Sequence, residues 1–142
     1  MLALQALCAF EAVGGDFPAQ LREFLADEQV LRDLNIPVPL PADLAEFASV
    51  LAEGVWRRRE WLDAQLSQTA VHWSLARMTP VDRNVLRLGL YELLECPATP
   101  PQVAINEAIE LARLFGDADS PAFVNGVLDA IRRRFRAQAG ES

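Results

Sequence analysis

One predicted helix is apolar around most of its circumference, and it constrains the fold more than any other feature. It begins at Thr79-Pro80-Val81-Asp82, which supplies a capping hydroxyl, a proline at the first helical position and a carboxylate in the first turn. Its apolar residues before Glu95 fall on several faces: Val81, Val85, Leu86, Leu88, Leu90, Tyr91, Leu93 and Leu94. A helix that is apolar all round is buried, so the spacing predicts a central helix.

The rest of the chain also has helical spacing, with apolar residues at three- and four-residue steps and no strand-like alternation. Some thirty residues from Ala42 are predicted to form two helices divided near Gly54, and a short helical turn is predicted at residues 73–78. Further helices are predicted over residues 2–13, 18–33, 103–115 and 121–138. The predicted fold class is all-α, a compact bundle of about seven helices. A length of 142 residues suits a single domain over residues 1–142.

Composition argues against several classes of protein. No uncharged apolar run reaches the roughly 18 residues of a membrane-spanning helix. The apolar start carries Glu11 and lacks the basic residues of a signal peptide, so we expect a cytoplasmic protein with no membrane partner. Cys8, Cys96 and His72 form no metal-ligand cluster. We therefore expect reduced thiols, no metal and no cofactor.

No catalytic motif is present. The chain has no nucleophile elbow, P-loop or dinucleotide-binding fingerprint, so it is predicted not to be an enzyme. Asp117 and Asp119 resemble part of a metal-binding loop, but the glycine and the final glutamate of an EF-hand are missing. A solvated loop between two helices is the favoured interpretation.

The charge distribution bears on nucleic-acid binding in two opposite ways. The net charge of −7 argues against it, because binding to phosphates draws on positive charge. However, every basic residue is an arginine, and two runs stand out, at residues 57–59 and 132–136. A local arginine patch can bind phosphates on an acidic protein, so the net charge does not decide the question.

The last predicted helix carries a candidate base-stacking ring. Its apolar stripe is formed by Val124, Val127, Leu128, Ile131 and Phe135. Phe123 is displaced from that stripe by about a quarter turn, toward the flank of Arg134 with Arg133 adjacent. An aromatic ring near guanidinium groups is a platform for an unpaired base. From spacing alone, packing of Phe123 under the preceding loop is the favoured alternative.

Three sequence blocks follow one another over some fifty residues. They are VDRNVLRLGLYEL at 81–93, VAINEAIELA at 103–112, and FGD at 115–117 followed by SPAFVNGVLD at 120–129. In this order they resemble the NusB family. Looser similarity extends over nearly the whole chain. The resemblance implies a bundle of about seven helices that catalyses no reaction. It also implies binding of the boxA element of ribosomal RNA leaders together with the ribosomal protein NusE. The pair then loads onto RNA polymerase with other Nus factors.

The resemblance also implies roles for individual residues. The segment with Asp119, Ser120 and Phe123 is expected to contact RNA. Arg133 and Arg134 are further RNA-binding candidates, on the ground of their helical spacing from Phe123 and not of the resemblance. Asp82 is expected to face NusE or to lie near it.

The chain departs from the family at its start. Family members begin with an arginine-rich arm before an ALQALY-like segment, whereas the first basic residue here is Arg22 and Cys8 replaces the tyrosine. Unless the true start lies upstream, RNA binding should be weaker and less dependent on salt. Two alternatives stay open: a protein-only scaffold or homodimer that has lost RNA binding, and a domain related to that of rRNA cytosine methyltransferases.

Overall fold

The computed structural model describes residues 1–11, 15–70, 75 and 78–138. Within these residues there are eight helices and no strand, so the all-α prediction is confirmed. None of these helices is long and apolar enough to cross a membrane. Contacts divide the chain into two compact units, Met1–Arg57 and Arg58–Ser142. That residues 1–142 form one folding domain stays a prediction.

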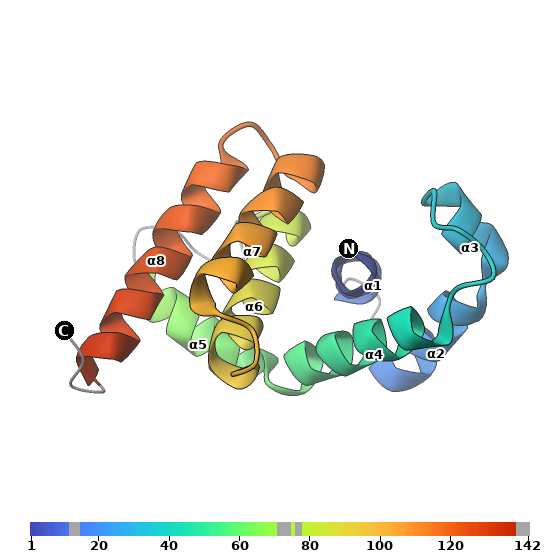
Figure 1. Cartoon of the computed structure of the whole chain (residues 1–142), viewed down its shortest axis with the longest axis horizontal. Coiled ribbons are helices and arrows are strands. Elements are labelled where there is room, and N and C mark those ends of the chain that lie inside the picture. Colours follow the sequence, from blue (N-terminus) through green and yellow to red (C-terminus); the bar gives the residue numbers. More distant parts are fainter. Residues whose placement is uncertain (12–14, 71–74, 76–77, 139–142) are drawn as a thin grey trace. The chain divides into compact units, whose positions relative to one another are not determined.

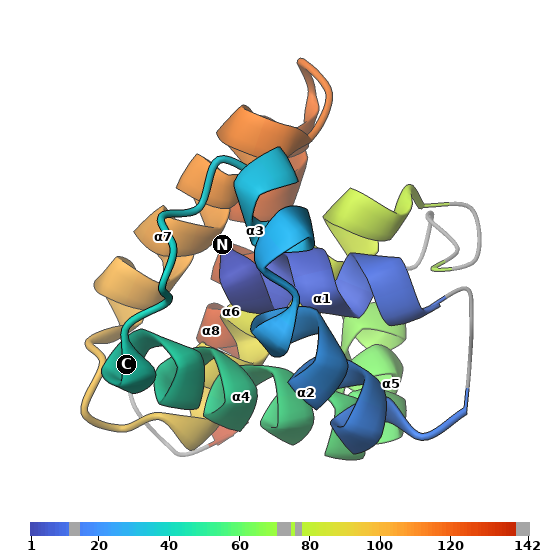
Figure 2. The same ribbon diagram turned by 90° about the vertical axis from the view of Figure 1, so that its right-hand side faces the viewer.

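The first unit contains α1 (Leu2–Glu11), α2 (Phe17–Ala26), α3 (Glu28–Asp33) and α4 (Ala42–Arg57). Within it α1, α2 and α4 contact one another, and α3 follows α2 (Figure 2). Phe17 is fully buried and stacks on Trp56 with 4.7 Å between ring centroids. Phe10 meets Phe17 edge-on at 5.9 Å, so aromatic rings from three helices pack together in this unit.

Asp27 divides the single helix that was predicted over residues 18–33 into two. Its backbone is extended, with φ −86° and a ψ of 96° that lies outside the helical range. The Asp27 carboxylate accepts hydrogen bonds from the backbone N–H groups of Gln29 and Val30, at 3.1 and 3.2 Å. A carboxylate in this position caps a new helix, which is why α3 begins here.

The predicted division after Ala42 is confirmed, but its position was wrong. The break between α4 and α5 falls at Arg58, and Gly54 lies buried inside α4. Leu44 and Phe47 were expected on the inner side of this helix and are instead 51% and 62% exposed. The buried residues of α4 begin only at Ala48, so the neighbouring helices cover its later turns and not its start.

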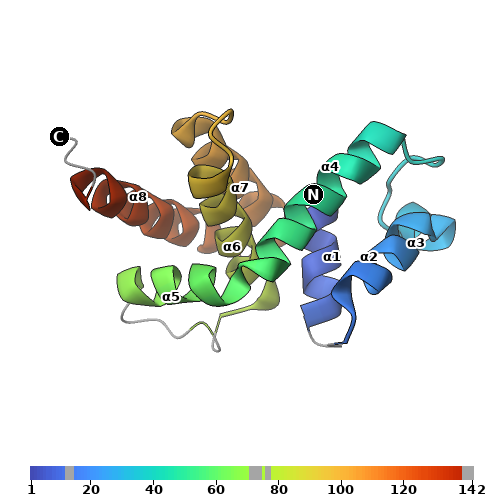
Figure 3. The same ribbon diagram turned by 90° about the horizontal axis from the view of Figure 1, so that it is seen from below.

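The second unit contains α5 (Arg59–Thr69), α6 (Pro80–Glu95), α7 (Pro101–Phe115) and α8 (Ser120–Gln138). Helices α6, α7 and α8 lie side by side (Figure 1), and α5 contacts both α6 and α8 (Figure 3). Seven consecutive residues of α6, from Asn84 to Leu90, are buried. This confirms the prediction of a central helix. Of the turn predicted at residues 73–78, only Leu75 and Met78 are among the described residues.

Gly89 marks the closest approach of α6 to its neighbours. A Cβ at this position would lie 2.7 Å from Leu128 Cδ1 and 3.1 Å from Ala108 Cβ. The side chain of Leu128 can move, but the Ala108 Cβ is fixed to the backbone of α7. Only a residue without a side chain therefore allows these three helices to pack at this distance.

We expect Gly89→Val to lower the free energy of unfolding by about 2–3 kcal/mol, because an overpacked core must shift its helices apart. Gly126→Val is the matched control, since a Cβ at Gly126 would meet nothing within 4 Å. That variant should change stability by less than about 0.5 kcal/mol. Urea unfolding measures both, and equal effects of the two substitutions would refute the packing role of Gly89.

A nearly buried ion pair joins α5 to α6. Arg87 is 7% exposed, and its Nε and Nη2 donate to the two carboxylate oxygens of Asp63, each at 2.7 Å. The Nη1 of this guanidinium donates to Asn84 Oδ1 at 3.1 Å. The fork of Arg87 thus matches the carboxylate of Asp63 with two parallel hydrogen bonds, which is the strongest geometry for such a pair.

Candidate nucleic-acid interface

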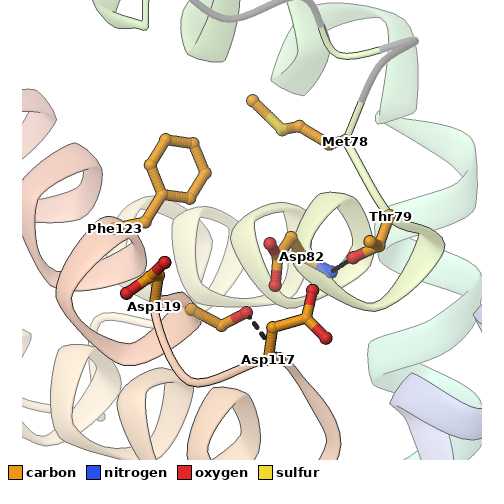
Figure 4. A pocket seen from close by; sticks show the side chains of 7 residues that line it. Met78, Thr79, Asp82, Asp117, Asp119 and Phe123 are labelled. Carbon is orange, nitrogen blue, oxygen red and sulfur yellow. Dashed lines mark hydrogen bonds between the residues drawn. The ribbon is translucent and has the colours of Figure 1, made fainter.

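A pocket of about 450 Å³ opens in the second unit, where the start of α6 lies close to the start of α8 (Figure 4). Residues from three segments line it: the start of α6 with the residues before it, the loop after α7, and the first turn of α8. They are Met78, Thr79, Asp82, Asp117, Asp119, Ser120 and Phe123. The pocket therefore combines one aromatic ring, one thioether, two hydroxyls and three carboxylates.

Two helix starts position these side chains. Thr79 Oγ1 accepts the backbone N–H of Asp82 at 3.1 Å, as the sequence predicts for a helix cap. Ser120 is 2% exposed, and its Oγ accepts the backbone N–H of Asp117 at 2.9 Å, which closes the loop between α7 and α8. A Cβ at Gly116 would lie 2.6 Å from that hydroxyl oxygen, so the tight loop requires glycine.

Phe123 lies one turn into α8, and its ring points toward Met78 across the pocket (Figure 4). The side chain is half-buried, whereas Val124, Val127, Leu128 and Ile131 are buried. This confirms the prediction that Phe123 is displaced from the apolar stripe of the helix. The ring is one wall of the pocket and remains partly accessible.

The polar lining of the pocket is rich in hydrogen-bond acceptors. Asp82, Asp117 and Asp119 each contribute a carboxylate, and none of the described lining residues is basic. Asp82 Oδ1 is buried and has no hydrogen-bond partner among the described residues. Three negative charges repel phosphate groups but accept hydrogen bonds from the N–H groups of a nucleobase.

Arg133 and Arg134 lie away from this pocket. They follow Phe123 by ten and eleven residues, or about 15 Å along the helix axis. Arg134 donates to Gln65 Oε1 at 2.7 Å and to Thr69 Oγ1 at 3.1 Å, which ties α8 to α5. Arg133 pairs with Asp129 at 3.1 Å on an exposed face. The structure does not bring these arginines together with Phe123, and their contact with RNA stays a prediction.

The pocket unites residues that the sequence predicted for two different roles. Asp119, Ser120 and Phe123 were expected to contact RNA, whereas Asp82 was expected near the protein partner, and all four line the same cavity. Sequence reasoning did not include Met78 and Thr79 in the site. The helix-start signal at Thr79 was recognised, but the approach of that start to α8 is a tertiary feature.

A pair of carboxyl groups joins the later part of α6 to α7. Glu92 is half-buried, and burial raises its pKa from 4.5 to about 7, aided by a side-chain hydrogen bond to Glu107 of α7 and by the charge of that group. The native chain therefore holds a proton on Glu92 at pH values where the unfolded chain has lost it.

The raised pKa of Glu92 predicts a pH dependence of stability. Its contribution is full below pH 4.5 and is lost as the pH rises through about 7, since the native state binds the extra proton between these values. Because solvent still reaches the group, we expect a loss on the order of 1 kcal/mol. Glu92→Gln should flatten this part of the profile and make the protein more stable at pH 8. Urea unfolding at several pH values checks this, and an unchanged slope in the variant would contradict it.

Comparison with known proteins identifies the family. The sequence profile described as the NusB family matches residues 1–133. The transcription antitermination protein NusB of Desulfosudis oleivorans is 42% identical over 135 residues, which cover 93% of this chain and 81% of that protein. The chain belongs to the NusB family. The family resemblance seen in the three sequence blocks is thereby confirmed.

Solved structures agree with this assignment to the NusB family. NusB from T. maritima matches with a TM-score of 0.78 at 34% identity, over 93% of this chain and 86% of that one. A second match, with a TM-score of 0.75 at 28% identity, covers 94% of this chain and 92% of the other. It belongs to a crystal structure of the antitermination factors NusB and NusE in complex with dsRNA. The predicted NusB-like helical fold is confirmed.

Proposed function

We propose that this chain is a transcription antitermination factor that binds boxA-type single-stranded RNA together with the ribosomal protein NusE. With other Nus factors the pair loads onto RNA polymerase and supports processive transcription of ribosomal RNA operons. The chain acts in the cytoplasm by binding, not by catalysis. Relatives named as antitermination proteins support this function, as does a structural neighbour solved with NusE and RNA.

The observation that carries the RNA-binding role is the half-buried ring of Phe123 in an open pocket. Unpaired bases stack on aromatic rings whose faces remain accessible, and this interaction tolerates an acidic surrounding better than phosphate binding does. Asp119 and Ser120 line the same pocket, at positions where the family resemblance implies RNA contact.

Fluorescence anisotropy with a labelled boxA RNA tests this function. The RNA is titrated with the protein at two salt concentrations, with and without NusE. We expect tighter binding when NusE is present, because the pocket alone offers few contacts to phosphates. Absence of binding under all four conditions would remove the RNA role.

A protein-only scaffold or homodimer is the second candidate. The net charge of −7 and the three carboxylates around Phe123 favour it, because negative charge repels the phosphates of RNA. Sedimentation velocity at several protein concentrations distinguishes it. A concentration-dependent dimer that binds no RNA would support the scaffold, and a monomer that binds RNA would exclude it.

A further inference from the structure

The outer face of α4 has apolar side chains at its centre and opposite charges at its two ends. It is formed by the exposed residues Asp43, Glu46, Phe47, Val50 and Arg57. We propose that two copies of the chain pair through this face, with their α4 helices side by side and antiparallel. The pairing requires neither RNA nor NusE, so it goes beyond the proposed function.

The exposed apolar side chains at the centre of this face are the first argument. Phe47 and Val50 are 62% and 59% exposed, and Leu44 beside them is 51% exposed. Three of the six large apolar side chains that are exposed in the described part of the chain therefore belong to one helix. Leu44 and Phe47 also line an apolar pocket of about 400 Å³ within the first unit. Contiguous apolar surface of this kind marks a site of association.

The charges at the two ends of the face favour a second copy as the partner. Asp43 is in the first turn of α4 and Arg57 in the last, and each is seven residues from Val50. Seven residues are close to two helical turns, so the three side chains lie along one line. An antiparallel pair centred on Val50 places Asp43 of each copy beside Arg57 of the other, and the two-fold symmetry makes this match twice. Parallel helices would bring like charges together, so the charges also set the orientation.

The remaining charges and the size of the face set the strength of the pair. Glu46 lies within one turn of Asp43, so it adds to the attraction of Arg57 from the other copy. Glu53 is half-buried beside the face and comes near Glu46 of the other copy, which weakens the match. A pair of 16-residue helices also buries less surface than a standard protein interface. We therefore expect a reversible dimer with a Kd of about 10–100 μM.

Sedimentation velocity of the full chain from about 1 to 300 μM tests the association. We expect the wild-type chain to change from monomer to dimer across this range. Val50→Glu places two carboxylates at the two-fold axis and should raise the Kd at least about tenfold. Leu114→Glu is the matched control, since Leu114 is 55% exposed but lies on α7, and it should leave the Kd unchanged. Both side chains are exposed, so thermal melts of the two variants should match the wild type.

An exchange of charges tests the antiparallel arrangement. Asp43→Arg and Arg57→Asp should each weaken self-association about tenfold, because each variant brings like charges together at both ends of the pair. A 1:1 mixture of the two variants should restore the wild-type affinity. In the mixed dimer the new arginine of one variant meets the new aspartate of the other, and the two unchanged residues pair at the opposite end. Only folded chains can pair in this way, so misfolding of a variant cannot imitate the restoration.

Three results would overturn the inference. A wild-type chain that stays monomeric over the whole concentration range does not pair through α4. A dimer that Leu114→Glu disrupts and Val50→Glu leaves intact forms through another face. A 1:1 mixture that associates no better than either charge variant alone refutes the antiparallel pairing of Asp43 with Arg57.

Discussion

Phe123→Ala is expected to weaken binding of boxA RNA about tenfold to a hundredfold, because stacking of one base on an aromatic ring contributes about 1–3 kcal/mol. The ring lines the pocket, is half-buried and lies off the buried stripe of α8. The melting temperature should therefore fall by no more than a few degrees. Anisotropy in the presence of NusE and a thermal melt measure the two effects on the same sample.

Phe135→Ala is the matched control for this variant. Phe135 is also a half-buried phenylalanine of α8, but it packs near Trp61 with 6.5 Å between ring centroids and lies under the Arg134 guanidinium. Its loss should lower stability and leave RNA affinity unchanged. A large drop in the melting temperature of Phe123→Ala with unchanged affinity would show that Phe123 is a core residue instead.

Asp63→Ala is expected to lower the free energy of unfolding by about 3 kcal/mol, because it deprives the nearly buried Arg87 of its carboxylate. An arginine cannot lose its charge to relieve this cost. For a chain of this length the melting temperature should fall by roughly 10 °C. Arg87→Met should cost less, since Asp63 is 28% exposed and can be solvated by water.

Arg113→Ala provides the comparison with a surface ion pair. Arg113 pairs with Glu110 three residues earlier on the same helix, and both side chains are more than half exposed. Pairs of this kind contribute little, so the variant should lose less than about 0.5 kcal/mol. If Asp63→Ala were no more damaging than Arg113→Ala, the link between α5 and α6 through Arg87 would not be a stabilising contact.

Local signals in the sequence predicted much of the fold. The start of α6 was predicted from Thr79, Pro80 and Asp82, and the predicted end at Glu95 also agrees with the structure. The division at Asp27 was missed because the apolar spacing continues across it, and only the extended backbone and the cap reveal two helices. Gly54 was taken as a break because glycine weakens helices, yet inside α4 it is buried.

The candidate site was predictable only in part. The quarter-turn displacement of Phe123 followed from helical geometry alone. That Asp82 enters the same pocket depends on how α6 packs against α8, and no spacing within one helix contains this information. The contacts of Arg134 with Gln65 and Thr69 join residues more than sixty positions apart, so the sequence does not show them. Arg134 is therefore less available for RNA binding than the arginine run at residues 132–136 indicated.

An NMR titration of the isotope-labelled protein with boxA RNA and NusE tests the central claim most directly. Binding of a base at the pocket predicts that the largest RNA-dependent shifts occur at the Phe123 ring and the amides of Asp119 and Ser120. Shifts confined to Arg133 and Arg134 at the far end of α8, or no shifts on addition of RNA, would contradict the claim.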